Sequence, residues 1–158
     1  MSRQVILSHS PQETYDLGRR LGALLPASFF IALQGELGGG KTCFTRGLVA
    51  AVSPDSSHMV ASPTFAIMNE YPGETPIYHF DFYRLTSPHE IVELGFEDYF
   101  TANGICVAEW SERLEELLPV DHLRITFEHA GDDLRKITIE AVSPASITIL
   151  EDFKSKNS

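Results

Sequence analysis

Apolar and polar positions recur along this chain with the periods of both strands and helices. The run Ser28–Gln34 is apolar except at its ends, which is typical of a strand buried on both faces. After a glycine-rich stretch, residues 41–51 place Phe44, Leu48 and Ala51 on one face of a predicted helix. A buried strand followed by an amphipathic helix predicts an α/β domain.

Helix-start signals predict three further helices. Ser10–Glu13 is a capping box with proline at the first helical position, and it predicts a helix over 10–25. The side chains on the inner face of this helix are Leu17, Leu21 and Leu24. Ser87–Glu90 repeats the signature and predicts a short helix that ends near Gly95. The remaining helix is expected over 111–118.

Five segments have the composition of strands, namely 65–71, 77–83, 104–109, 123–127 and 136–140. The last two alternate polar and apolar residues around Gly131–Asp133, which predicts a C-terminal antiparallel hairpin. Residues 53–62 are polar and predict a loop. The segment from Ala145 onward is short and ambiguous, and we expect the tail 154–158 to be disordered.

Residues 35–42 read Gly-Glu-Leu-Gly-Gly-Gly-Lys-Thr and match the phosphate-binding loop pattern G-x-x-x-x-G-K-[ST]. Gly35 and Gly40 allow backbone angles that let consecutive N–H groups turn around a phosphate. Lys41 supplies a positive charge for the β- and γ-phosphates, and the Thr42 hydroxyl suits Mg²⁺. The remaining loop positions are Glu36, Leu37, Gly38 and Gly39. The loop therefore predicts binding of a nucleoside triphosphate.

With the elements above, this loop predicts a P-loop NTPase-like α/β domain of three layers. We expect a mostly parallel central sheet that carries the C-terminal antiparallel hairpin. The chain has 158 residues and is 43% hydrophobic, so we expect one domain over residues 1–153.

A nucleotide site also needs an acid for the metal, usually at the carboxyl end of a strand beside the loop. Ile105–Glu109 is four apolar residues ending in a carboxylate, and we assign Glu109 to Mg²⁺, directly or through water. Asp81 is the second candidate, and we assign it near the metal or to positioning the attacking water. Either acid has a plainer explanation as a solvated strand end or a helix cap. For His79, a hydrogen-bonded structural role is more typical than a ligand role.

Charge and composition exclude several classes of protein. No stretch approaches the run of about 20 apolar residues that a membrane span needs, and the N-terminus lacks the apolar segment of a secretory signal. The spacing of Cys43 and Cys106 is not that of a disulfide framework, which favours reduced cysteines in a cytoplasmic protein. The net charge of −10 predicts repulsion of polyanions, so any RNA would be held by a basic partner.

Four motifs in a fixed order resemble those of the bacterial TsaE (YjeE) family, the ATPase subunits of the tRNA threonylcarbamoyladenosine machinery. The motifs are 35–42, Ser62–Thr64, His79–Arg84 and Glu109–Trp110. The segment 90–100 is also similar, and the resemblance spans about residues 10–143. Cys43 stands where the family commonly has a hydroxyl residue, and glycines 38–40 replace Gly-Ala-Gly. Neither departure removes a phosphate-binding group.

The resemblance implies an ATPase that works with TsaB and TsaD, of which TsaD transfers threonylcarbamoyl to an adenosine of tRNA. ATP hydrolysis would reset the complex between turnovers, and tRNA would be contacted only through the complex. The implied site comprises loop 35–42, Thr42 and Glu109 at Mg²⁺, Asp81 as an essential acid, and Trp110 near the nucleotide. The expected catalytic residues are therefore Lys41, Asp81 and Glu109.

Three other residues are assigned to the neighbourhood of the nucleotide. Thr64 is placed to sense the γ-phosphate from a switch-like loop, although a hydroxyl at a strand start explains it equally well. Trp110 is also explained by core packing. Arg135, on the last hairpin, is placed to reach the nucleotide.

Two alternative functions share the loop. A small-molecule kinase needs a lid that brings arginines over the transferring phosphate, and the arginines after the loop are scattered singly. A GTP-dependent switch would need an Asn-Lys-x-Asp guanine signature, which the sequence lacks. The ATPase subunit is the function that the sequence favours.

Overall fold

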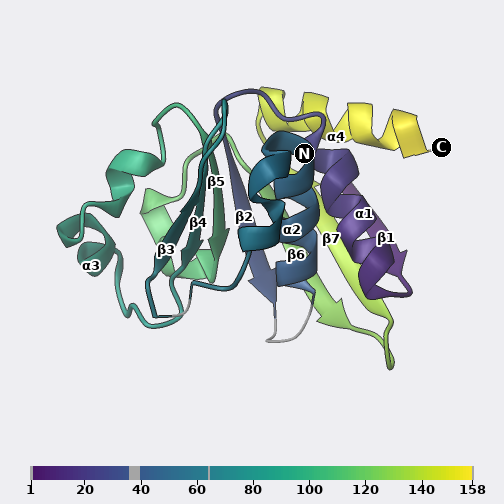
Figure 1. Cartoon of the computed structure of the whole chain (residues 1–158), viewed down its shortest axis with the longest axis horizontal. Helices are drawn as coiled ribbons and strands as arrows, with labels where there is room; N and C mark the ends of the chain where they lie inside the picture. Colours follow the sequence, from purple (N-terminus) through teal and green to yellow (C-terminus); the bar gives the residue numbers. More distant parts are fainter. Residues whose placement is uncertain (1, 36–39, 64, 158) are drawn as a thin grey trace.

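The computed structural model describes residues 2–35, 40–63 and 65–157. Its centre is a sheet to which the described residues contribute seven strands (Figure 1). The strands are β1 (Ser2–Ser8), β2 (Phe29–Gly35), β3 (Met68–Tyr71), β4 (Ile77–Asp81), β5 (Ile105–Glu109), β6 (Leu123–His129) and β7 (Arg135–Ala141). Their order across the sheet is β1-β7-β6-β2-β5-β4-β3.

The sheet is mixed, whereas the sequence predicted a mostly parallel one. Its centre is parallel, because β2 pairs with both β5 and β6 and β4 pairs with β5 in that sense. Among the described strands the other three pairings, β1–β7, β6–β7 and β3–β4, are antiparallel. The parallel centre brings the carboxyl ends of β2, β5 and β4 to one edge of the sheet.

Helices cover both faces of this sheet. The α-helices are α1 (Pro11–Gly22), α2 (Lys41–Val52), α3 (Pro88–Glu93) and α4 (Pro144–Asn157). Figure 1 shows α1 and α2 side by side against the sheet, with α3 at the far end of the molecule. The buried apolar residues form two clusters, one between the sheet and α1, α2 and α4, the other beneath α3 and the short helical turns near it.

The predicted start of α1 is confirmed, but the hydrogen bond of the Glu13 side chain differs from that of a regular capping box. The Ser10 hydroxyl accepts from the Glu13 N–H at 3.1 Å, as a capping box requires. The Glu13 carboxylate accepts a hydrogen bond from the N–H of His9 at 3.0 Å, one residue before the cap. The helix ends at Gly22, three residues earlier than expected.

Two glycines allow α1 and α2 to cross with their backbones in contact. A Cβ at Gly18 would lie 2.1 Å from the carbonyl oxygen of Phe44, and one at Gly47 would lie 2.0 Å from that of Tyr15. Neither distance leaves room for a methyl group. This close packing sets the position of α2, and so of its first turn.

Residues 111–118 do not form the predicted α-helix. They form two short 3₁₀ turns, Ser111–Arg113 and Glu115–Leu117. The backbone is left-handed both at Trp110, with φ +58°, and at Glu115, with φ +48°. A left-handed residue inside the segment ends the right-handed helix there.

Both ends of the chain are more regular than the sequence suggested. The N-terminal residues form edge strand β1, which pairs along β7. The segment from residue 144 is the 14-residue helix α4, and it reaches Asn157, where we expected a disordered tail from Lys154. The side chains that bury this helix against the sheet are Ile149, Leu150 and Phe153. The polar segment 53–62 contains the 3₁₀ helix Pro54–Met59.

Candidate active site

The glycines at the two ends of the predicted phosphate loop have special backbone geometry. Gly35 ends β2 with φ +130°, and a Cβ there would lie 2.3 Å from the Phe127 carbonyl oxygen. Gly40 is left-handed, with φ +100°, and is the N-cap residue of α2. Both positions therefore exclude a side chain. The predicted ligand positions between them, Glu36, Leu37, Gly38 and Gly39, lie outside the described residues, as does Thr64.

Lys41 is the first residue of α2, and its side chain reaches back to the end of β2. Nζ donates to the carbonyl oxygen of Gly35 at 2.9 Å. The same ammonium group lies 5.2 Å from the ring centroid of Trp110, within cation–π range. Lys41 is buried despite its charge, so both contacts help to offset its loss of hydration.

The first turn of α2 is electrostatically suited to an anion. Its N–H groups have no intrahelical partners, and the helix dipole makes this end positive. This turn contains no acidic residue. Thr42 is its second residue and is partly exposed, so its hydroxyl is available beside Lys41.

Asp81 and Glu109 lie side by side at the carboxyl ends of β4 and β5. The sheet register aligns Leu33, Glu109 and Asp81 across three parallel strands. Residues aligned in this way point to the same face, and Leu33 belongs to the core beneath α2. Both carboxylates are buried, on the face that α2 covers.

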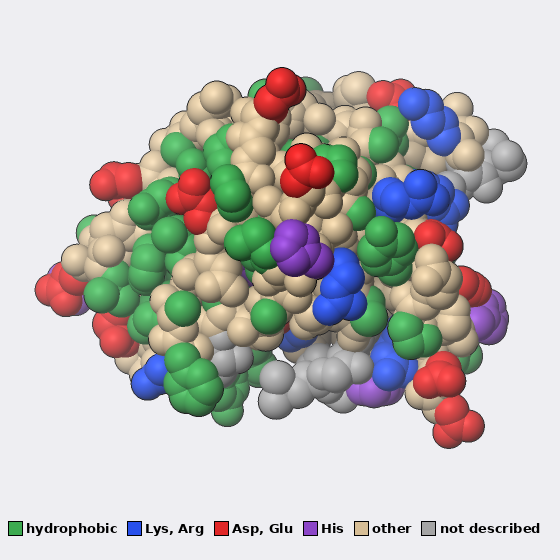
Figure 2. All heavy atoms as spheres, viewed as in Figure 1, with side chains coloured by type: hydrophobic (Ala, Val, Ile, Leu, Met, Phe, Trp, Pro, Cys, Tyr) green, Lys and Arg blue, Asp and Glu red, His purple; other side chains and the backbone are tan. Residues whose placement is uncertain are grey.

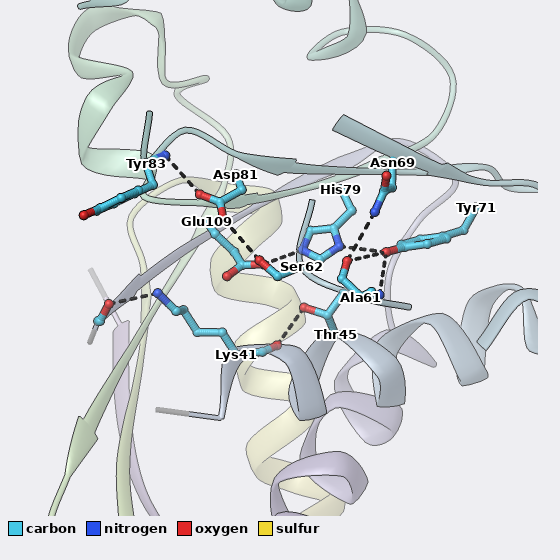
Figure 3. A network of polar contacts seen from close by, with 11 residues as sticks. Lys41, Thr45, Ala61, Ser62, Asn69, Tyr71, His79, Asp81, Tyr83 and Glu109 are labelled. Carbon is cyan, nitrogen blue, oxygen red and sulfur yellow. Dashed lines mark hydrogen bonds and ion pairs between the residues drawn. The ribbon is translucent and has the colours of Figure 1, made fainter. Parts of the chain in front are cut away.

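Asp81 is held by the segment before β3 and by its own strand end (Figure 3). Its Oδ2 accepts from the Ser62 hydroxyl at 3.1 Å, and its Oδ1 accepts from the N–H of Tyr83 at 3.0 Å. Its own N–H donates to the carbonyl oxygen of Ile67 at 2.8 Å. Two hydrogen bonds therefore orient the carboxylate, and the third holds the backbone of Asp81.

Glu109 is held by His79. Oε2 of Glu109 lies 2.6 Å from Nε2 of His79, and both side chains are buried. The other ring nitrogen, Nδ1, lies 2.9 Å from the hydroxyl of Tyr71. The structural interpretation of His79 thus agrees with its contacts, while Tyr71 was not foreseen. Only the cross-strand placement of Tyr71 near His79, set by the β3–β4 register, brings the two together.

Trp110 follows Glu109 in the left-handed conformation and is half-buried. Its ring lies 5.0 Å from the ring of Tyr83 and 5.6 Å from the guanidinium carbon of Arg113. It also packs against the core beneath α3. The ring therefore packs against this core and also contacts Lys41, while its place near a nucleotide stays a prediction.

Arg135 lines a separate cavity of about 110 Å³ beside the end of the loop. Its guanidinium Nη1 donates to the carbonyl oxygens of Asp132 and Leu134 at 3.0 and 3.2 Å. The other residues that line the cavity are Ser10, Pro11, Thr14, Gly40, Cys43 and Asp133. The structure thus brings Lys41, Trp110, Asp81 and Glu109 into one neighbourhood and Arg135 into a cavity that adjoins it through Gly40.

The fold and the site define a mixed α/β domain in which a lysine, two buried acids and a tryptophan gather where its parallel strands end. A model of the family "Threonylcarbamoyl adenosine biosynthesis protein TsaE" matches residues 8–137. The chain belongs to the TsaE family, whose role is in tRNA threonylcarbamoyladenosine biosynthesis.

Individual relatives cover most of the chain. The tRNA threonylcarbamoyladenosine biosynthesis protein TsaE of Bacillus subtilis is 40% identical over 134 residues, which is 84% of this chain and 82% of the relative. The protein of the same name from Treponema pallidum is 35% identical over 84% of this chain and 97% of its own length. The crystal structure of YdiB from Bacillus subtilis superposes with a TM-score of 0.82 at 31% identity, covering 99% and 97% of the two chains. The resemblance predicted from the four motifs is confirmed.

Across the described ranges 2–35, 40–63 and 65–157, no helix combines the length and the apolar character needed to cross a bilayer.

Proposed function

We propose that this chain binds ATP and Mg²⁺ at the first turn of α2 and hydrolyses the ATP. It would serve as the ATPase subunit of a complex that makes threonylcarbamoyladenosine in tRNA, with TsaB-like and TsaD-like partners. Hydrolysis resets that complex, and a partner transfers the threonylcarbamoyl group. The observation that carries this proposal is that the Lys41 ammonium group packs on Trp110, the residue that follows Glu109, whose carboxylate is aligned with that of Asp81.

The phosphates are the part of the ligand that the site fits best. Gly35 and Gly40, at the two ends of the loop, have φ angles of +130° and +100° that side-chain-bearing residues rarely adopt, and the dipole of α2 favours negative charge at its first turn. Lys41 would exchange its hydrogen bond with the Gly35 carbonyl for phosphate oxygens. A charged phosphate is a stronger partner for an ammonium group than a neutral carbonyl.

Mg²⁺ fits the oxygen atoms that the site offers. The hydroxyl of Thr42 and the carboxylate of Glu109 are hard ligands, and Mg²⁺ usually takes one or two such protein groups together with phosphate oxygens. When bound, the ion would neutralise charge that develops on the phosphates. Asp81, held by Ser62 and the Tyr83 N–H, is placed to orient the attacking water.

The cavity beside Arg135 is the candidate position for the base and ribose. It adjoins Gly40, so a nucleotide whose phosphates lie on the loop can extend into it. The Arg135 guanidinium group offers a flat cationic surface for a purine ring. This assignment would give Arg135 a role in nucleotide binding from the cavity that it shares with Gly40.

Hydrolysis by the isolated chain should be slow. The Arg113 guanidinium packs over Trp110 and that of Arg84 over Phe65, so each of these two guanidinium groups is already engaged by an aromatic ring. An arginine finger supplied from outside is worth 10³- to 10⁵-fold in systems that use one. Docking of a partner would therefore complete the site.

The charge of the chain fits indirect contact with tRNA. Acidic side chains are spread over the face shown in Figure 2, and Lys and Arg gather there mainly over α1 and α4. With a net charge of −10, the chain as a whole repels a polyanion. A basic partner would hold the tRNA.

The test is the turnover of Mg·ATP by the purified chain with and without the two partner proteins. We expect slow release of inorganic phosphate alone and a large increase when both partners are present. Equal rates would contradict the role proposed for the partners. GTP competing with ATP at equal concentration would contradict the choice of adenine, and γ-phosphate appearing on a small molecule would favour a kinase.

A further inference from the structure

A continuous chain of hydrogen bonds runs from the main chain of Ala61 to the carboxylate of Glu109 (Figure 3). Ala61 N–H lies 3.4 Å from the Tyr71 hydroxyl oxygen, which lies 2.9 Å from His79 Nδ1, and His79 Nε2 lies 2.6 Å from Glu109 Oε2. The side chains of Tyr71, His79 and Glu109 are all buried. The links from Tyr71 through His79 to Glu109 are therefore shielded from water, whereas Ala61, at the other end of the chain, is exposed.

The chemistry of the groups sets the direction of these bonds. A carboxylate only accepts, so Nε2 of His79 carries a proton and donates a hydrogen bond to Glu109. In the neutral ring, Nδ1 then accepts from Tyr71. The Tyr71 oxygen also lies 3.2 Å from the carbonyl oxygen of Ala61, which accepts from the Asn69 amide at 3.2 Å. Asn69 thus keeps that carbonyl satisfied when Tyr71 donates to the ring.

We propose that Tyr71 and His79 are positioning residues that fix the Glu109 carboxylate and couple it to the segment 61–63. The Mg²⁺ role of Glu109 in this inference rests on the proposed function. The coupling itself is a property of the hydrogen-bond chain. Residues that orient a ligand carboxylate in this way commonly change metal affinity 10- to 100-fold when they are removed.

The same short segment also holds the second acid. Ser62 donates to Asp81 at 3.1 Å, one residue after Ala61 contacts Tyr71. Two main-chain hydrogen bonds also connect the segment to β4. The Pro63 carbonyl oxygen accepts from the Ile67 N–H at 2.7 Å, and the Ile67 carbonyl oxygen accepts from the Asp81 N–H at 2.8 Å. Movement of 61–63 would therefore disturb Asp81 directly and Glu109 through Tyr71 and His79. One segment thus links both acids.

The first experiment needs no nucleotide. Backbone amide NMR spectra are compared for the full chain and its Glu109→Gln variant, both in the wild-type and in the Tyr71→Phe background. We expect Glu109→Gln to shift the amide signals of Ala61 and Ser62, and we expect that shift to shrink severalfold when the Tyr71 hydroxyl is absent. An Ala61 signal that does not respond to Glu109→Gln, or that responds equally in both backgrounds, would overturn the coupling.

The second experiment measures the affinity of Mn²⁺, used in place of Mg²⁺, for the complex with a non-hydrolysable ATP analogue by electron paramagnetic resonance. We expect Tyr71→Phe to weaken Mn²⁺ binding severalfold, and His79→Ala to weaken it by on the order of tenfold or more. His79→Gln retains an amide donor for Glu109, so it should recover much of the affinity while still breaking the link to Ala61.

Tyr78→Phe is the matched control, since it also removes a tyrosine hydroxyl. Tyr78 precedes His79 in β4 and points to the opposite face of the sheet, beside Tyr99. The control substitution should leave Mn²⁺ binding unchanged. Urea unfolding of each variant separates loss of fold from loss of positioning. Unchanged Mn²⁺ affinity in both Tyr71→Phe and His79→Ala would overturn the positioning role. If the wild-type chain bound no nucleotide, the proposed function would fall, and the NMR comparison would still decide the coupling.

Discussion

Nζ of Lys41 donates a hydrogen bond to the carbonyl oxygen of Gly35 at 2.9 Å, so one side chain joins the two ends of the glycine-rich segment. The ammonium group is thereby held at the end of β2, where the Gly35 carbonyl oxygen accepts one of its hydrogen bonds. A ligand replaces this hydrogen bond only if it binds the ammonium group more strongly than the neutral carbonyl does. The charged oxygens of a polyanion form such stronger hydrogen bonds.

The first prediction removes that charge. Lys41→Met keeps the length and apolar contacts of the side chain but has no ammonium group, and we expect ATP affinity to fall at least 100-fold by isothermal titration calorimetry. Lys154→Met, on α4, makes the same change outside the site and should leave the affinity unaltered. Retention of near-normal affinity by Lys41→Met would place the phosphates elsewhere.

The second prediction separates the two acids. Glu109→Ala should abolish the dependence of ATP affinity on Mg²⁺, because the assigned metal carboxylate is gone. Asp81→Asn should retain Mg²⁺-dependent binding and lose most of the turnover, because the water is no longer oriented. ATP titrations with and without Mg²⁺, alongside phosphate release, measure both effects. Full metal-dependent turnover in Glu109→Ala would transfer the metal role to Asp81.

The third prediction uses Trp110, the single tryptophan of the sequence. The Lys41 ammonium group lies 5.2 Å from its ring, and binding of phosphates would draw that charge away. We therefore expect ATP to change the intensity of tryptophan emission in the wild-type chain and to leave Lys41→Met unchanged. A nucleotide-induced change of equal size in Lys41→Met would show that the signal has another origin.

The fourth prediction concerns the two cysteines. Cys43 is partly exposed and lines the cavity beside Gly40, while Cys106 is buried in β5. Burial raises the pKa of Cys106 to about 12, so its reactive thiolate is scarce in the folded protein below that pH. An alkylating reagent at pH 8 should modify Cys43 alone, as read by mass spectrometry, and saturating ATP should slow that reaction.

Cys43→Ala is the control, and it should leave the folded chain unmodified until urea exposes Cys106. Modification of Cys106 in the native protein at pH 8 would contradict its burial. Modification of Cys43 at the same rate with and without ATP would contradict the position proposed for the base.

Much of the site could be predicted from sequence because its parts are local. Gly35, Gly40 and Lys41 belong to one short motif, and Glu109 ends a run of apolar residues that reads as a buried strand. The register that aligns Asp81 with Glu109 follows from two parallel strands whose carboxyl ends share an edge. The predicted capping of α1 needed only neighbouring residues as well.

The features that escaped prediction depend on contacts between distant segments. Tyr71 meets His79 only because β3 and β4 pair in one register, and no local pattern marks it. The strand β1 is stabilised by pairing with β7, more than a hundred residues away. The prediction of a helix at 111–118 was wrong because the backbone is left-handed at Trp110 and Glu115, which the composition of the segment does not reveal. Helix α4 is stabilised by burying Phe153, which its sequence alone does not show.

The last prediction tests how α2, and with it Lys41, is held in place. Alanine in mid-helix is intrinsically better than glycine by about 1 kcal/mol, so Gly47→Ala would stabilise an isolated α2. In the protein the new Cβ would lie 2.0 Å from the Tyr15 carbonyl oxygen, and only separation of the two helix backbones relieves that contact. Overpacking of this kind costs about 1–3 kcal/mol, and here both partners are backbone, so the steric cost should exceed the helical gain.

We therefore expect Gly47→Ala to lower the free energy of unfolding in urea and to weaken ATP binding, because the first turn of α2 shifts with the helix. Gly22→Ala is the graded comparison, since its Cβ would lie 3.0 Å from the Leu48 carbonyl oxygen and needs only a small adjustment. Gly22→Ala should lower the free energy of unfolding less than Gly47→Ala does. If Gly47→Ala were as stable as the wild-type chain, α1 would not be what sets the position of the lysine.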